Sequence, residues 1–161
     1  MLAVPGSAIT FQRGPTEPSF TQRIDTLKPE YDPAIVFVQG GINDTVSPRI
    51  RGVRADLETF LKAVKAAYPK AEIVVIGPFN RKDPMPSTFQ TVNNAMLAAA
   101  ASQGAFWVSP ITAKWITAAN IPAVIEPGGD HPGNKGHAYL ASILASTLDG
   151  MIGNYPPAPL G

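Results

Sequence analysis

Residues 34–38 have the sequence Ala-Ile-Val-Phe-Val, and this short apolar run decides the fold. Asp32-Pro33 stands before the run and Gly40-Gly41 stands just after it. An unbroken apolar run of this length between turn-forming residues is typical of a strand buried on both faces, as strands of parallel sheets are. We therefore expect a buried strand here, followed by a loop that leaves its carboxyl end at the two glycines.

The same kind of run occurs twice more along the chain. Residues 73–76 are Ile-Val-Val-Ile and residues 105–108 are Ala-Phe-Trp-Val, and each run is soon followed by a proline. Apolar side chains at helical spacing predict helices between and after these strands, at residues 48–68, 88–102 and 136–151. Alternating buried strands and helices are the pattern of a parallel α/β sheet that is covered by helices on both faces.

Shorter segments carry weaker signals. Ser87 or Thr88 is expected to cap the second helix through its hydroxyl. Residues 112–119 are expected to form a short helix, and residues 121–125 an extended segment. Together with the three strands, these segments complete the expected order of elements.

The overall composition narrows the class of protein. The chain has 161 residues, which suits one domain; we place it at residues 1–150, followed by a Pro-rich extended tail at residues 151–161. A hydrophobic content of 45% argues against disorder, and a net charge of +1 without a basic cluster argues against a nucleic-acid partner. The longest apolar run, residues 95–101, is far shorter than the roughly 20 residues of a membrane span. The absence of cysteine excludes disulfides, thiolate metal sites and a cysteine nucleophile.

The loop after the first strand is the first candidate for chemistry. Ligands of open parallel sheets bind beyond the carboxyl ends of the strands. Here Gly40-Gly41, which allows close backbone approach, is followed by Ile42, Asn43 and Asp44. The Asn43 amide at this rim can donate a hydrogen bond to a developing oxyanion. Alternatively, Asn43 and Asp44 cap a turn or the next helix.

The second candidate is the stretch at residues 128–137, which holds both histidines. Because Pro132 follows it, His131 is biased toward an extended loop conformation. An imidazole on such a loop can act as a general base if a carboxylate holds its tautomer, and Asp130 and Glu126 are close enough in sequence for that role. His137 is expected to be an ordinary helix residue. Two histidines without a third ligand are a weak zinc signal, so we expect no metal or other cofactor.

These residues resemble the motifs of the SGNH (GDSL-like) hydrolase family. The resemblance lies in Gly41-x-Asn43-Asp44 after a buried strand and in His131-Pro132 before the last helix. Residues 2–7 are similar to the family segment whose glycine N–H helps to form the oxyanion hole. The resemblance implies that Gly6 and Asn43 are oxyanion donors and that His131 is the general base. It also implies a three-layer α/β/α, flavodoxin-like fold.

The chain departs from the family pattern at the nucleophile and at the acid. It contains no Gly-Asp-Ser block, so the family's first strand is expected to be missing, and Ser7 is at most a substitute nucleophile. Gly128 stands where the family has an aspartate. On an extended backbone the neighbouring Asp130 points away from His131, unless the two glycines allow a sharp bend or a backbone carbonyl orients the ring instead.

The missing strand has a structural consequence. In the family's strand order the first strand lies in the middle of the sheet, so the strand at residues 35–38 would become an edge. An unpaired apolar edge tends to pair with another strand, so we expect an upstream segment or a second chain to cover it.

We therefore expect a serine-type ester hydrolase domain that acts on a small-molecule or carbohydrate ester, without its nucleophile block. Loop residues 80–86 would form a wall of the site. The expected substrate-binding residues are Gly41, Ser7, Asp44 and Trp115, although Trp115 would serve equally well in the core. The alternative is a non-catalytic module that binds carbohydrate or has a structural role. A nucleotide-binding role is disfavoured, because the loop lacks the P-loop lysine and the full dinucleotide glycine pattern.

Overall fold

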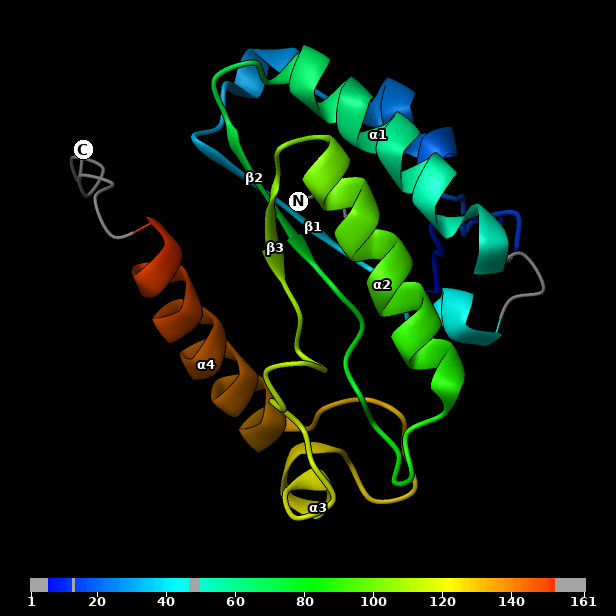
Figure 1. Ribbon diagram of the computed structural model, residues 1–161, viewed down its shortest axis with the longest axis vertical. Coiled ribbons are helices and arrows are strands. Elements are labelled where there is room, and N and C mark those ends of the chain that lie inside the picture. The colour runs from blue at the N-terminus through cyan, green and yellow to red at the C-terminus, as the bar shows by residue number, and fades with distance from the viewer. Residues whose placement is uncertain (1–5, 13, 47–49, 153–161) are drawn as a thin grey trace.

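The computed structural model describes residues 6–12, 14–46 and 50–152 and contains a parallel sheet of three strands (Figure 1). The strands are β1 (Ile35–Gln39), β2 (Glu72–Ile76) and β3 (Phe106–Val108), and their order in the sheet is β1-β2-β3. The predicted strands are thus confirmed.

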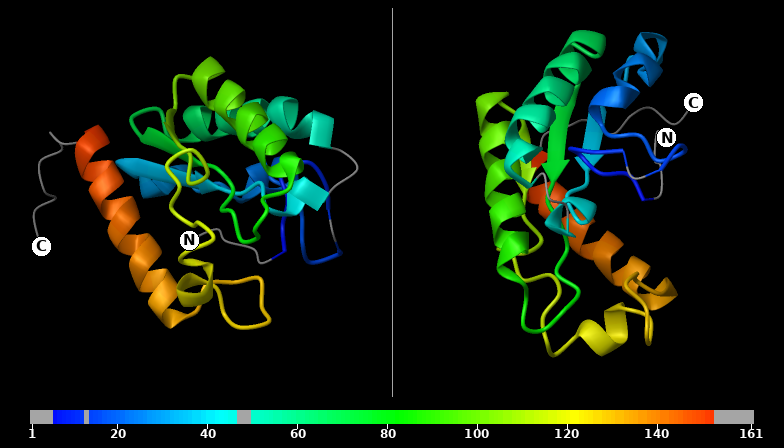
Figure 2. Two further views of the ribbon diagram at one scale, coloured as in Figure 1. Left: turned by 60° about the horizontal axis from the view of Figure 1, so that its bottom comes forward. Right: turned by 90° about the vertical axis from the view of Figure 1, so that its right-hand side faces the viewer.

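Helices cover both faces of this sheet (Figure 2). The helices α1 (Val53–Ala67) and α2 (Ser87–Ser102) pack together on one face, and α4 (Asn134–Ile152) packs on the other. Short helices occupy the connections: η1 (Thr21–Thr26), η2 (Pro29–Tyr31), η3 (Asn43–Val46), η4 (Ile50–Gly52) and α3 (Ile121–Val124). This arrangement confirms the predicted three-layer α/β/α fold.

The central strand explains why the apolar runs determine this fold. Successive side chains of β2 point to opposite faces, so Ile73 and Val75 join the core beneath α1 and α2, whereas Val74 and Ile76 join the core beneath α4. All four side chains are buried. A strand enclosed on both faces needs an unbroken apolar sequence, which is the signal seen in the chain.

Strand β1 lies at one edge of the sheet, as expected. Within the described residues it pairs with β2 alone, and the register places Val38 opposite Val75. Phe37 points to the same face as Ile35, which packs against the core beneath α4, yet Phe37 remains 49% exposed. The edge of the sheet therefore carries an uncovered aromatic side chain.

Three local predictions are wrong. Residues 112–119 form turns instead of a helix, and Lys114 has a φ of 52°, which a right-handed helix does not allow. Residues 121–124 form the helix α3 instead of an extended segment, because Pro122 suits the first turn of a helix. Pro86 occupies the N-cap position of α2, which has no side-chain cap, so neither Ser87 nor Thr88 caps it.

The remaining predictions concern the ends of the chain. Residues 2–5 of the family-like opening and residues 153–161 of the expected tail lie outside the described residues. Within the described part, no helix combines the length and the apolar character that a membrane span requires.

Candidate active site

Three loops lie at the carboxyl end of the sheet, and two of them carry Asn43 and His131 (Figure 1). The loop after β1 holds Asn43, the loop at residues 77–86 follows β2, and the loop at residues 126–133 holds His131. The loop after β2 contacts both of the others: a Cβ at Gly41 would lie 3.5 Å from Pro78, and Arg81 pairs with Asp130. Asn43 and His131 therefore lie at the same end of the sheet.

The two glycines that end β1 allow the loop to leave close to the core. A Cβ at Gly40 would lie 2.7 Å from Cζ of Phe20, and one at Gly41 would lie 2.6 Å from Sδ of Met96. Gly41 also has a φ of 92°, which favours glycine. The predicted close backbone approach is confirmed, but the groups approached are core side chains. Gly41 is buried against α2.

Among the described residues, one hydrogen bond holds the Asn43 side chain. Its Nδ2 donates to the backbone carbonyl of Ser7 at 2.9 Å. An amide nitrogen carries two N–H groups, so this bond orients the side chain and leaves one N–H without a partner among the described residues. The residue is half-buried, so its side chain is partly open to solvent. This geometry is what an oxyanion donor needs.

Asp44 has a different role from its neighbour. Its carboxylate is fully buried. One oxygen accepts the N–H of Ile9 at 2.9 Å, and the other accepts the N–H of Thr10 at 3.0 Å and the Thr10 hydroxyl at 2.8 Å. Asp44 thus anchors the segment that carries Gly6 and Ser7, and its carboxylate is closed to a substrate.

Gly6 and Ser7 lie beside Asn43 through the Asn43–Ser7 hydrogen bond. Gly6 has a φ of 78°, and a Cβ at this position would collide with the Glu17 carboxylate. The positive φ explains why a glycine stands there, since the Glu17 side chain is flexible and could move aside. No hydrogen bond within the described residues joins the Ser7 hydroxyl to His131, so the structure gives this serine no base.

The loop that carries His131 is a narrow hairpin. Ile125 and Pro132 form an antiparallel bridge, and the N–H of Glu126 donates to the His131 carbonyl at 3.0 Å. At the tip, the N–H of Gly129 donates to the Glu126 carbonyl at 2.9 Å, and Gly128 has a φ of 71°. A proline followed by a positive-φ glycine is the arrangement of a type II turn. The turn explains why glycine stands at residue 128, where the family has an aspartate.

Among the described residues, neither predicted acid partner forms an ion pair or a hydrogen bond with the His131 ring. Asp130 pairs with Arg81 instead, with 3.3 Å between its Oδ2 and Nη1 of the arginine. The Glu126 side chain lies against Gly133, where a Cβ would be 3.1 Å from its Cγ. The exposed His131 ring has no hydrogen-bond partner among the described residues. Arg81 is the residue that sequence reasoning missed, because an isolated arginine in a loop carries no recognisable signal.

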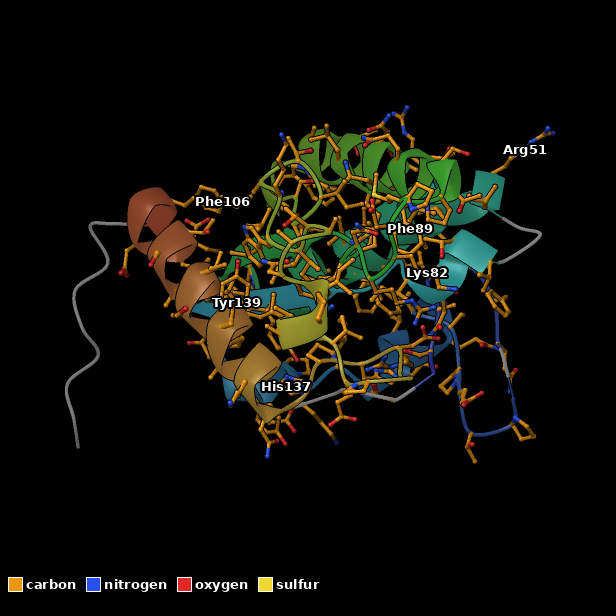
Figure 3. All side chains as sticks on the ribbon, turned by 90° about the horizontal axis from the view of Figure 1, so that it is seen from below. Arg51, Lys82, Phe89, Phe106, His137 and Tyr139 are labelled. Carbon is orange, nitrogen blue, oxygen red and sulfur yellow. The ribbon has the colours of Figure 1, made fainter. Side chains whose placement is uncertain are left out.

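The other two candidates lie on the α4 side of the sheet. Trp115 is only 4% exposed and packs against Phe79, with 6.1 Å between the ring centroids. It therefore belongs to the core, the alternative that the sequence left open, and reaches the loop after β2 only through Phe79. His137 is exposed on α4, near Tyr139, as expected for an ordinary helix residue (Figure 3).

Among the described residues, no group of three or more His, Asp or Glu side chains could hold a metal ion. The pKa of Glu58 is lowered by the hydrogen bond from Arg54, and the pKa of Arg23 is lowered by burial. Neither residue belongs to the three loops.

Comparison with known proteins gives a family match for most of the chain. The model of the GDSL-like lipase/acylhydrolase family matches residues 1–139. A GDSL lipase from Mycobacterium tuberculosis is 32% identical over 120 residues, which are 73% of this chain and 51% of that protein. The chain thus spans about half the length of this curated relative.

Solved structures show the same fold. A protein from Lactobacillus plantarum has a TM-score of 0.73 at 21% identity, over 90% of this chain and 77% of its own. A peptidoglycan O-acetylesterase has a TM-score of 0.69 at 17% identity, over 83% of this chain and 42% of its own. Together with the family match, these similarities lead to one conclusion: the chain belongs to the GDSL-like lipase/acylhydrolase family.

Proposed function

We propose that this chain carries the oxyanion donor and the general base of a serine ester hydrolase that cleaves acyl or acetyl esters. The observation that carries the proposal is the Asn43 amide, which is oriented by the Ser7 carbonyl and keeps one N–H available at the end of the sheet that also holds the His131 loop. Family membership and the presence of an acetylesterase among the similar structures support the ester chemistry.

In the proposed reaction a serine Oγ attacks the ester carbonyl carbon while His131 takes the hydroxyl proton. The carbonyl oxygen becomes an oxyanion, which accepts hydrogen bonds from Asn43 Nδ2 and from the Gly6 N–H. Collapse of this intermediate breaks the bond to the alcohol, which leaves with the proton from His131. Water then hydrolyses the acyl-enzyme by the same steps and releases the acid.

The serine itself has to come from outside the described site. We propose that a further strand pairs with the free edge of β1 and delivers the nucleophile to the rim where Asn43 lies. The exposed ring of Phe37 beside this edge supports the idea, since an added strand with its connection would cover it. An upstream segment of a longer polypeptide, or a second chain, could supply such a strand.

A direct test compares p-nitrophenyl acetate hydrolysis by the polypeptide that the gene encodes with hydrolysis by three variants. We expect His131→Ala to remove the activity, and Asn43→Ala to lower kcat by about 100- to 1,000-fold, the usual cost of losing an oxyanion donor. His137→Ala is the matched control and should keep the full rate, because this exposed ring lies on α4. Equal rates for the wild type and His131→Ala would exclude His131 as the base.

One set of observations favours a second candidate, a non-catalytic module that binds carbohydrate. The His131 ring has no partner among the described residues, Asp130 is taken up by Arg81, and the sequence lacks the Gly-Asp-Ser block. Binding of an acetylated oligosaccharide by calorimetry, with no release of acetate over a long incubation, would favour this module over the hydrolase.

A further inference from the structure

One ion pair joins two of the three loops at the end of the sheet. Nη1 of Arg81, on the loop after β2, lies 3.3 Å from Oδ2 of Asp130, on the hairpin that carries His131. The other ion pairs among the described residues are Arg54–Glu58 within α1 and Lys70–Asp32, and neither involves these loops. The pair is also asymmetric: the Arg81 side chain is 18% exposed, whereas Asp130 is 54% exposed.

The burial of Arg81 is unfavourable by itself. Its Nε is buried without a hydrogen-bond partner, and it is the one buried side-chain nitrogen or oxygen in this condition within the described residues. Burying an unpaired N–H destabilises a fold, and an exposed ion pair returns little stability. A contribution to stability is therefore a poor explanation for an arginine at this position.

The ion pair acts on the least supported part of the hairpin. Backbone bonds close its base, from Glu126 to the His131 carbonyl and from Gly133 to the Val124 carbonyl. The tip has only the turn bond between Gly129 and Glu126. Asp130 lies between this tip and His131, so its attachment to Arg81 determines how the last residues before the imidazole lie.

We infer that Arg81 is a positioning residue, which holds the His131 hairpin against the loop after β2 through Asp130. In this chain the Asp130 carboxylate attaches the hairpin to Arg81 and is not paired with the His131 imidazole. The effect of Arg81 on catalysis rests on the proposed function. The attachment of the His131 hairpin through Arg81 and Asp130 does not rest on it. Arg81 would thus act on the reaction through the placement of His131, without touching the substrate.

The first experiment measures the attachment without any activity. Amide hydrogen exchange is followed in the wild type, Arg81→Met, Asp130→Asn and the double variant. We expect exchange at Glu126, Gly129 and Gly133 to rise by up to about fivefold in each single variant, the factor that an ion pair of ordinary strength supports. The double variant should exchange no faster than the single ones, since each single substitution already removes the pair. The melting temperature of Arg81→Met should not fall, because this substitution also removes the buried Nε that has no partner.

Lys82 provides the matched control. It is the next residue along the chain and is exposed on the same loop (Figure 3). Lys82→Met removes the same charge and should leave the exchange of the hairpin amides unchanged. Unaltered exchange in Arg81→Met and Asp130→Asn, or equal acceleration in Lys82→Met, would overturn the inference.

The second experiment measures ester hydrolysis by the active polypeptide. We expect Arg81→Met and Asp130→Asn to lower kcat by a similar factor, with KM unchanged, and Arg81→Lys to recover part of the loss. A raised KM in Arg81→Met alone would mean direct contact with the substrate and would overturn the positioning role. If even the wild type does not hydrolyse the ester, the proposed function fails, while the exchange data still decide whether Arg81 holds the hairpin.

Discussion

Asn43 and Asp44 are neighbours in the chain, yet their side chains are used in different ways. Among the described residues, the Asp44 carboxylate accepts three hydrogen bonds, whereas the Asn43 amide nitrogen donates one and has a second N–H without a partner. Asp44 sets the position of the segment that carries Gly6 and Ser7. Asn43 then uses the Ser7 carbonyl of this segment to orient its own side-chain amide. The Asn43-Asp44 motif therefore combines a residue that anchors the Gly6–Ser7 segment with a candidate hydrogen-bond donor to an oxyanion.

The anchor leads to a prediction about stability. Asp44→Asn replaces one carboxylate oxygen with an NH₂ group, which faces a buried N–H donor and cannot accept its hydrogen bond. We expect a loss of about 2–4 kcal/mol in the free energy of unfolding, measured by urea denaturation, because a buried donor loses a charged acceptor. Asp25→Asn is the matched control: Asp25 is exposed on η1, so its substitution should change little. Similar midpoints for the two variants would contradict the anchoring role.

How much of the site is predictable also depends on the residue. Asn43 and His131 follow recognisable signals, a glycine-terminated strand and a His-Pro loop. No sequence signal identifies the partners of Asp130 and Glu126. A carboxylate on a hairpin can turn toward several groups, and only the tertiary arrangement selects one of them. Arg81 was missed for the same reason, since its importance comes from its burial and from a partner that lies far along the chain.

At the scale of elements, the strands were predictable because burial on both faces leaves an unbroken apolar sequence. The structure of the region between β3 and α4 was not predictable. Its apolar residues are buried, but they recur at neither the helical nor the strand spacing. Trp115 and Ile116 are buried by tertiary contacts from a turn, and α3 is a single short helix with Pro122 in its first turn. Local sequence cannot distinguish these cases from an extended segment.

The contact between α3 and α4 leads to a second stability prediction. A Cβ at Gly136, in the first turn of α4, would overlap the carbonyl oxygen of Val124, the same carbonyl that accepts the N–H of Gly133. We expect Gly136→Ala to lower the free energy of unfolding by about 1–3 kcal/mol, as overpacking does. The hairpin that carries His131 should also exchange its amides faster.

Gly150 in the same helix is the matched control for this substitution. Nothing lies within 4 Å of a Cβ at that position. Gly150→Ala should therefore raise the free energy of unfolding by about 0.5–1 kcal/mol, because alanine is the better helix former. Destabilisation by both variants in denaturant titrations would mean that the close contact with Val124 is not what requires glycine at residue 136.

At the scale of the whole molecule, the two faces of the sheet are covered unequally. Two long helices cover one face, whereas one long helix, α4, covers the other together with residues 115–125, and β1 lies at an edge of the sheet. An uncovered strand edge beside an exposed aromatic ring is a surface on which another strand can pair. The candidate site lies at the carboxyl end of this same edge strand, so whatever pairs with β1 also completes the surroundings of Asn43.

This edge predicts how residues 1–161 behave when they are produced alone. We expect the isolated chain to associate with itself through β1, with a sedimentation coefficient that rises with concentration. Phe37→Lys should shift the chain toward the monomer, because a charge on an edge strand opposes pairing. Tyr31→Lys is the matched control: Tyr31 is 68% exposed but lies on η2, so its substitution should leave association unchanged. A wild-type chain that stays monomeric at high concentration, with rapid exchange at the β1 amides that do not bond to β2, would show that the edge is stable without a partner.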